Sequence, residues 1–260
     1  MSVKQLFDLT GKVALITGGT KGLGLQMAEA LGEQGAKVFI SARNAAEVDE
    51  VVAQLNAQGV EAGGIACDLG KLDTHPVKTL VDAVEAKFGT VDILVNNAGT
   101  TWGQPAEEHS YEGWQKVMTL NVDVCFLMAQ EVARRFMIPR RSGKIINIAS
   151  IAGFKGNRAN SGIHTVAYNT SKAAAINLTR ALAGEWGTYN INVNAICPGY
   201  FPTKMAKGLE KVTELIKEGT PLGRIGGEED IKGPAVFLAS EASRHVTGQA
   251  IAVDGGNSVV

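Results

Sequence analysis

Short apolar segments alternate with segments of helical periodicity along this chain of 260 residues. Most of the apolar segments lack the alternation expected of a sheet with one wet face, and parallel strands covered on both faces have this pattern. The order strand, helix, strand predicts right-handed crossovers and an α/β fold built on a doubly wound, seven-stranded parallel sheet. The predicted strands are 13–17, 37–41, 63–67, 92–96, 144–149, 191–196 and 249–254, and the predicted helices are 23–34, 45–58, 75–88, 111–137, 167–187, 205–217 and 228–239. The chain has no internal repeat and no linker, so we expect one domain over residues 1–260.

Composition narrows the classes of partner. The chain is 45% hydrophobic and 20% charged, with a formal net charge of −1. The balance of charges gives no reason to expect nucleic acid or an anionic membrane as a partner, and no apolar run reaches the roughly 18 residues of a membrane span. Cys67, Cys125 and Cys197 have no metal-ligand spacing, so we expect them to be small buried residues and expect no metal. Together with an N-terminus that lacks the apolar core of a signal peptide, they favour the cytoplasm.

A glycine-rich segment, TGGTKGLG, follows the first predicted strand and precedes a helix. Gly18, Gly22 and Gly24 allow a tight turn whose backbone approaches a phosphate and whose helix N-terminus points at it. The segment is not a P-loop, because no Gly-Lys-Ser/Thr ends it. The alternative is a packing turn that binds nothing.

The end of the second predicted strand indicates which dinucleotide binds. A carboxylate there would accept hydrogen bonds from the ribose of NAD. This chain has Ser41, Ala42 and Arg43 instead, and Lys21 adds a cation in the glycine turn. Two cations without a carboxylate favour a ribose 2′-phosphate, and hence NADP(H) rather than NAD(H). The alternative is that both cations are solvated surface charges.

Tyr168 and Lys172 lie one turn apart near the start of the predicted helix 167–187, so they share a face. A free phenol has a pKa near 10, and a neighbouring ammonium should lower it toward working pH. Alone, this pair could equally be a tyrosine at the edge of the core and a solvated lysine. It is accompanied, however, by Ser150 after the fifth strand, by Asn121 in the segment LNV, and by the segments NNAG (96–99) and CPGYFPT (197–203).

With these motifs in this order, the chain resembles the short-chain dehydrogenase/reductase family from about Gly11 to Gly256. The resemblance implies a Rossmann-type fold and reversible hydride transfer between NADP(H) and a ketone or secondary alcohol. Tyr168 would be the general acid/base, Ser150 would hold the substrate oxygen, and Lys172 would bind the nicotinamide ribose and lower the tyrosine pKa. Asn121 would anchor a water in a proton relay.

The resemblance also implies the residues that line the site, and a homotetramer acting on a small carbonyl or alcohol. We expect the faces of the two long helices that carry Ala133, Ala174 and Leu178 to contribute to assembly. The cofactor-binding residues would be Gly18, Thr20, Lys21, Gly22, Leu23, Gly24, Arg43, Asp68, Leu69, Asn96, Ala98, Gly99, Tyr168, Lys172, Pro198, Gly199 and Thr203. The substrate-pocket residues would be Trp102, Gln104, Ser150, Tyr168, Tyr200 and Phe201, with residues 200–219 as a substrate lid.

One departure from the family pattern bears on the substrate. Tyr168 lies 18 residues after Ser150, a few more than in many members of the family. The inserted segment contains Lys155, Arg158 and His164, which could form a wall or clamp for an anionic or polyhydroxy substrate, or a solvated loop.

The chain is most similar to 3-oxoacyl reductase-like and gluconate 5-dehydrogenase-like members, so the substrate is expected to be a 3-oxoacyl thioester or a keto-sugar acid. A catalytically silent NADP-binding sensor or scaffold is the alternative. A sugar-nucleotide epimerase would need a longer C-terminal substrate domain.

Overall fold

The computed structural model describes residues 1–157, 162–202 and 213–260. At its centre lies a seven-stranded sheet in the order β3-β2-β1-β4-β5-β6-β7, in which every neighbouring pair of strands is parallel. The order reverses between β1 and β4, which creates the switch point where this fold class binds ligands. The strands are β1 Val13–Thr17, β2 Lys37–Ala42, β3 Ala62–Ala66, β4 Ile93–Asn96, β5 Gly143–Ile148, β6 Ile191–Pro198 and β7 Ala250–Val253. The predicted parallel doubly wound sheet is therefore confirmed.

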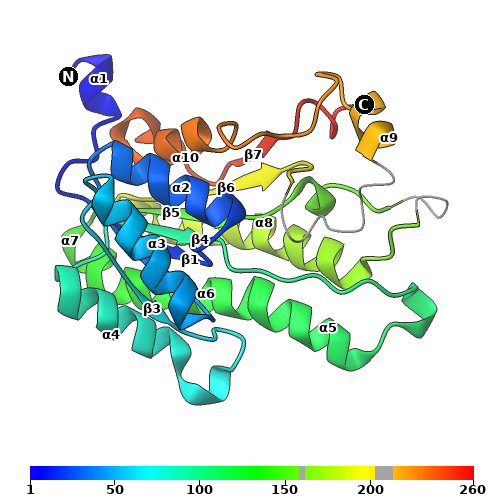
Figure 1. Ribbon diagram of the computed structural model, residues 1–260, viewed down its shortest axis with the longest axis horizontal. Coiled ribbons are helices and arrows are strands. Elements are labelled where there is room, and N and C mark those ends of the chain that lie inside the picture. Colours follow the sequence, from blue (N-terminus) through cyan, green and yellow to red (C-terminus); the bar gives the residue numbers. More distant parts are fainter. Residues whose placement is uncertain (158–161, 203–212) are drawn as a thin grey trace.

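Helices cover both faces of the sheet (Figure 1). Three helices pack on one face: α2 Gly22–Glu33, α3 Ala45–Ala57 and α10 Lys232–Ala239. The other face carries α4 Pro76–Phe88, α6 Val124–Val132 and α8 Val166–Trp186, with α5 Tyr111–Met118 continuing into α6. The remaining helices are α1 Val3–Leu6, α7 Ile138–Arg140 and α9 Thr213–Glu218, and short 3-10 segments lie at Leu72–Thr74, Ala106–Glu108, Ile151–Gly153, Gly187–Tyr189 and Glu241–Ser243.

Side-chain alternation along β1 shows why these strands are apolar throughout. Ala14 and Ile16 lie in the first core cluster, under α2, α3 and α10, whereas Val13 and Leu15 lie in the second core cluster, under α4, α6 and α8. Both faces of the strand are thus buried, as expected for a parallel sheet with helices on each side. The polar residues that follow the strands consequently collect at the carboxyl edge.

The structure refines two of the predicted helices and adds one that was not predicted. The helix expected at 111–137 contains two π-helical segments, Thr119–Asp123 and Ala133–Met137. Most of the helix expected at 205–217 falls outside the described residues. Helix α1 was not predicted, and it begins at a capping box formed by Ser2 and Gln5. Ala133, expected on an outer helix face, is instead fully buried in the second core cluster.

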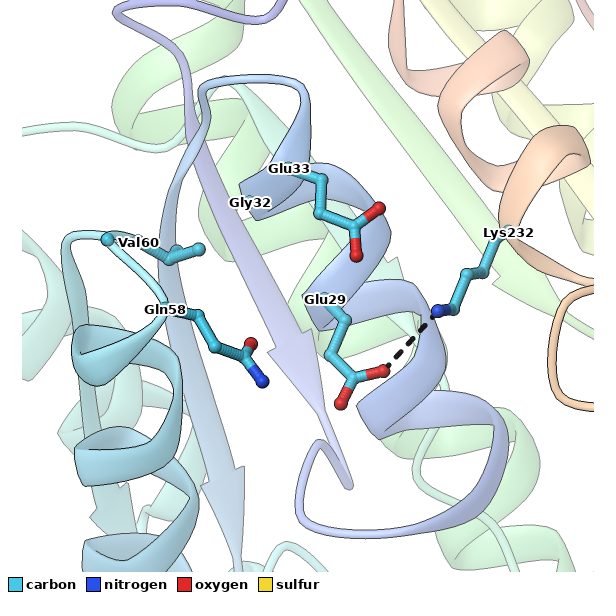
Figure 2. Close-up of a pocket in the computed structure, with 7 residues that line it drawn as sticks. Glu29, Gly32, Glu33, Gln58, Val60 and Lys232 are labelled. Atoms are coloured by element: carbon cyan, nitrogen blue, oxygen red, sulfur yellow. Dashed lines mark ion pairs between the residues drawn. The ribbon is translucent and has the colours of Figure 1, made fainter.

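A surface hollow lies away from the carboxyl ends of the strands, between the end of α2, the turn before β3 and the start of α10 (Figure 2). Within it, Lys232 Nζ lies 3.6 Å from a carboxylate oxygen of Glu29. Because ligands of this fold class bind at the carboxyl ends of the strands, this hollow is not the expected site. Within the described part of the chain, no helix is long and apolar enough to cross a membrane, and no cluster of acidic, histidine and cysteine side chains could hold a metal.

Candidate active site

The glycine turn forms a cradle between β1 and α2. Gly18 and Gly22 have φ angles of +67° and +53°, which favour glycine. A Cβ atom at Gly24 would lie 2.2 Å from the carbonyl oxygen of Gly18, so this position admits no side chain without a backbone shift. Helix α2 begins at Gly22, and its N-cap, Lys21, makes no side-chain capping bond. The first N–H groups of the helix are therefore available to a phosphate, and the turn fits a dinucleotide.

Asn97 fastens this turn to the neighbouring strand. Its side-chain amide donates to the carbonyl oxygens of Thr17 and Gly18, at 2.9 Å each. In return, the hydroxyl oxygen of Thr17 accepts hydrogen bonds from the backbone N–H groups of Asn97 and Ala98 at 3.0 Å. Asn97 was absent from the predicted site. Its place in the segment NNAG, directly after β4, was the signal that could have indicated it.

The edge where an adenosine ribose would lie carries both predicted cations and one unexpected carboxylate. Arg43 follows β2 and is exposed. Lys21 Nζ lies 2.6 Å from Oε2 of Glu47, a residue in the first turn of α3. The expectation of two cations without a carboxylate was therefore wrong in one respect, because the start of α3 brings Glu47 back onto the glycine turn.

Asn121 sits where the long helix widens into its first π-helical segment, a feature often found at functional sites. Its side chain forms two hydrogen bonds with the backbone of Thr100, as a paired strand would. Oδ1 accepts from the N–H of Thr100 at 2.8 Å, and Nδ2 donates to the carbonyl of Thr100 at 2.9 Å. Nδ2 also donates to the hydroxyl of Ser171 at 2.9 Å. These bonds hold the loop after β4 against the start of α8.

Ser150, Tyr168 and Lys172 converge at the carboxyl end of β5. The hydroxyl oxygen of Ser150 accepts from the N–H of Ala152 at 3.1 Å, and Ser150 is also hydrogen-bonded to Tyr168. Lys172 is buried, its Nζ lies 5.6 Å from the centroid of the Tyr168 ring, and it donates to the carbonyl oxygen of Ile148 at 2.7 Å. Gly99 completes the cluster, since a Cβ atom there would lie 3.2 Å from Asn121 Oδ1 and 3.6 Å from Lys172 Nζ.

Burial dominates the protonation equilibria at this cluster. It lowers the pKa of Lys172 to about 8 and raises the pKa of Tyr168 above its usual value, while the hydrogen bond from Ser150 opposes the rise. The expected lowering of the tyrosine pKa by Lys172 is thus not found in the protein alone. Burial also raises the pKa values of Cys125 and Cys197 to about 12, and both are buried as predicted, whereas Cys67 is only partly buried.

The other predicted cofactor residues occupy the same edge in different ways. Asn96 is buried, where its amide donates to the carbonyl of Cys125 at 3.2 Å and to Asn147 Oδ1 at 3.0 Å. Asp68 follows β3 and accepts from the N–H of Gly70 at 3.2 Å. Leu23 lies in the first turn of α2, Leu69 follows β3, and Pro198 ends β6 with Gly199 next to it, whereas Thr203 lies outside the described residues.

Comparison with known proteins agrees with this geometry. A family model described as enoyl-(acyl carrier protein) reductase matches residues 18–258. A 2-dehydro-3-deoxy-D-gluconate 5-dehydrogenase of Dickeya dadantii is 45% identical over 98% of both chains. The chain belongs to the short-chain dehydrogenase/reductase family. It is thus an oxidoreductase, and the family predicted from the order of the sequence motifs is confirmed.

Two further relatives indicate the range of substrates in this part of the family. The crystal structure of a gluconate 5-dehydrogenase from Burkholderia cenocepacia J2315, in complex with NADP and tartrate, superposes with a TM-score of 0.92 at 35% identity, covering all of both chains. A 3-oxoacyl-acyl-carrier-protein reductase of rhamnolipid biosynthesis from Pseudomonas aeruginosa is 38% identical, over 96% of this chain and 97% of its own.

Two loops predicted to border the substrate support each other. Trp102 Nε1 donates to Oε1 of Gln104 at 3.1 Å, and Lys116 Nζ lies 5.1 Å from the centroid of the Trp102 ring. The backbone N–H of Gln104 donates to the carbonyl of His164 at 2.9 Å, which ties the loop after β4 to the inserted segment. Trp102 and Gln104 are thus held in place by contacts with each other, with Lys116 and with the backbone of His164.

Two aromatic residues after β6 differ in burial. Tyr200 is half-buried, and burial raises its pKa. Phe201 is buried in the first core cluster, with Gly226 packed against its ring, so it serves packing more than the expected pocket. Half of the predicted lid at 200–219, residues 203–212, falls outside the described residues, as does Arg158.

Lys155, in the described part of the inserted segment, is held at both its backbone and its side chain. Its backbone carbonyl accepts from the side chain of Asn169, the residue next to Tyr168, at 2.9 Å. Its Nζ donates to the backbone and side-chain oxygens of Asn257 at 3.0 and 3.2 Å. These two acceptors are neutral, and the charge of Lys155 also helps to lower the pKa of the Asp254 carboxyl nearby.

Proposed function

We propose that this reductase interconverts a keto-sugar acid and the corresponding secondary alcohol with NADP(H) as cofactor. The relatives from Dickeya dadantii and Burkholderia cenocepacia, whose names specify sugar acids, support this substrate class. The observation that carries the proposal is Lys155, a cation of the inserted segment whose backbone carbonyl accepts from Asn169, the residue after Tyr168, and whose Nζ donates to the oxygens of Asn257.

The cofactor would lie across the carboxyl edge of the sheet. The uncapped start of α2 and the glycine turn would hold its pyrophosphate. Arg43 and Lys21 would meet a ribose 2′-phosphate, and an arginine can do so in bidentate fashion. The bound cofactor supplies or accepts the hydride, while the protein binds, orients and transfers protons.

Each catalytic side chain then has a separate task. The hydroxyl of Tyr168 donates a proton to the substrate oxygen during reduction and removes it during oxidation. Ser150 donates a hydrogen bond to the same oxygen. The Lys172 ammonium, one turn from Tyr168, favours the phenolate by its charge. Asn121 keeps the loop after β4 and the start of α8 in register, and we propose that it also anchors a relay water.

A substrate comparison tests the proposal. NADPH oxidation is measured with 5-keto-D-gluconate, with a ketohexose that lacks the carboxylate, and with acetoacetyl-CoA. We expect the keto acid to have the highest kcat/KM. Lys155→Gln should raise KM for the keto acid by about tenfold, because a hydrogen bond to a charged group contributes about 1.5–3 kcal/mol in favourable sites. The ketohexose should be unaffected.

Lys12→Gln is a matched control, since Lys12 is an exposed lysine at the amino end of β1. A higher kcat/KM for acetoacetyl-CoA than for the keto acid would replace the proposed substrate by a 3-oxoacyl thioester, the substrate class named for the Pseudomonas aeruginosa relative. If no ketone is turned over while NADPH binds, the chain is a cofactor-binding sensor or scaffold. The intact cluster of Ser150, Tyr168 and Lys172 argues against that alternative.

We also propose that the protein is a homotetramer of the cytoplasm. Exposed small residues on α8, such as Ala173 and Ala181, leave that helix free to pack against another copy. All three cysteines are unpaired, which suits a reducing compartment. Light scattering at micromolar concentration tests the assembly, and a monomeric mass would contradict it.

A further inference from the structure

We propose that Glu47 is a specificity-determining residue for the cofactor. Its carboxylate pairs with Lys21 and thereby reduces the affinity of the enzyme for a ribose 2′-phosphate. This inference rests on the proposed use of NADP(H) and adds a residue that opposes that preference.

The contacts of Glu47 place it on the glycine turn. Its Oε2 lies 2.6 Å from Lys21 Nζ and accepts a hydrogen bond from the hydroxyl of Thr20 at 3.3 Å. Pairing of Thr17 with Ser41 in the sheet brings the ends of β1 and β2 side by side, so that α3 starts next to the turn. A carboxylate from the first turn of α3 therefore meets the same lysine that would meet the phosphate.

Capping of α3 does not require the contact between Glu47 and Lys21. The side chain of Asn44 already caps α3 by accepting from the backbone N–H groups of Ala46 and Glu47. The side chains of Lys21 and Glu47 are 47% and 35% exposed, and ion pairs at such exposure contribute little to stability. The effect of the pair is greater on an incoming anion, because Lys21 must exchange one anionic partner for another.

Arg43 is in a different position from Lys21. It is exposed at the end of β2, and no ion-pair partner for it is found among the residues that the structure describes. Its charge is therefore fully available to a phosphate, whereas that of Lys21 is opposed by Glu47. We expect Arg43 to supply most of the discrimination in the wild type, and Lys21 to contribute fully only when Glu47 is neutral.

Two nucleotides that differ at the ribose isolate this effect. Binding of 2′,5′-ADP and of 5′-AMP to the full-length protein is measured by calorimetry, without substrate. Glu47→Gln should tighten 2′,5′-ADP by about three- to tenfold, because unit charges about 4 Å apart in water interact by about 1 kcal/mol. Binding of 5′-AMP should stay nearly constant, and the gain should shrink as salt is added.

Glu50→Gln is the control, since Glu50 is an exposed acid on the same helix with no ion pair in the described part of the chain. It removes the same net charge and should leave 2′,5′-ADP binding nearly unchanged. In a Lys21→Met background, the gain from Glu47→Gln should disappear, because the carboxylate acts through that lysine. Thermal unfolding of each variant verifies that it is folded.

The outcomes separate the inference from the proposed function. If the wild type binds 2′,5′-ADP no more tightly than 5′-AMP, the proposed NADP(H) preference fails. If 2′,5′-ADP is preferred but Glu47→Gln does not improve its binding, or improves it equally with Lys21→Met, the role of Glu47 is refuted. If Glu47→Gln weakens 5′-AMP instead, Glu47 binds ribose hydroxyls and the inference is also overturned.

Discussion

Replacing Gly24 with alanine tests whether the glycine turn is a fitted cradle. The added Cβ atom would lie 2.2 Å from the carbonyl oxygen of Gly18 and 2.5 Å from Asn97 Nδ2, so the turn must move away from α2. Overpacking of this kind costs about 1–3 kcal/mol, and the better helix propensity of alanine offsets up to about 1 kcal/mol. We expect a melting temperature lower by roughly 2–8 °C, as a domain of this size responds by about 2–4 °C per kcal/mol.

The same displacement should weaken cofactor binding. Because the turn and the first N–H groups of α2 no longer converge on one point, we expect Kd for NADPH to rise at least about tenfold, which corresponds to about 1.4 kcal/mol. Gly233→Ala is the matched control: Gly233 is exposed on α10 with no atom within 4 Å of an added Cβ, so this change should be neutral or slightly stabilising. A Gly24→Ala protein that matches wild type in both melting temperature and NADPH affinity would refute the cradle.

Three further predictions follow from the surroundings of the site. Asn97→Ala removes two hydrogen bonds to the glycine turn and should lower the free energy of unfolding by about 1–3 kcal/mol in urea titrations, with weaker NADPH binding by fluorescence. Because burial lowers the pKa of Lys172 from 10.5 to about 8, this group should raise the free energy of unfolding of the cofactor-free protein as the pH increases from 8, whereas Cys125 and Cys197, with pKa values raised from 9.0 to about 12, should lower it above pH 9. The difference in free energy of unfolding between wild type and Lys172→Met should therefore shift in favour of the wild type between pH 8 and 10.5. Cys125 and Cys197 should resist alkylation at pH 8 until the chain is unfolded, as followed by mass spectrometry.

The sheet could be predicted from the sequence because its central strands, β1, β4, β5 and β6, are buried on both faces. Their largely apolar segments are short, and the glycines and polar residues that follow them mark their carboxyl ends. The π-helical segment around Asn121 could not be predicted, because apolar periodicity does not distinguish one extra residue in a helical turn. The short α1 escaped for a different reason: its capping box is the only local signal, and none of its residues is buried.

The candidate site was predicted to different depths. The positions of Ser150, Tyr168 and Lys172 follow from motif order, since strand ends and the first turn of a helix meet at one edge. The contact between Lys21 and Glu47 depends on how α3 leaves β2, and no local pattern encodes it. The pKa values likewise depend on burial. Burial is why the pKa of Tyr168 is raised in the protein without cofactor, where a lowered pKa was expected.

The most direct test of the central claim, that Tyr168 is the proton donor, is the turnover of Tyr168→Phe at saturating NADPH. Phenylalanine keeps the ring beside Lys172 but removes the hydroxyl, so NADPH should bind with nearly unchanged Kd. General acid–base catalysis contributes about 10²- to 10⁴-fold, and kcat with 5-keto-D-gluconate, or with the best ketone of the substrate comparison, should fall by that factor. A kcat within about tenfold of wild type, with the cofactor bound, would contradict the assignment of Tyr168 as the catalytic acid.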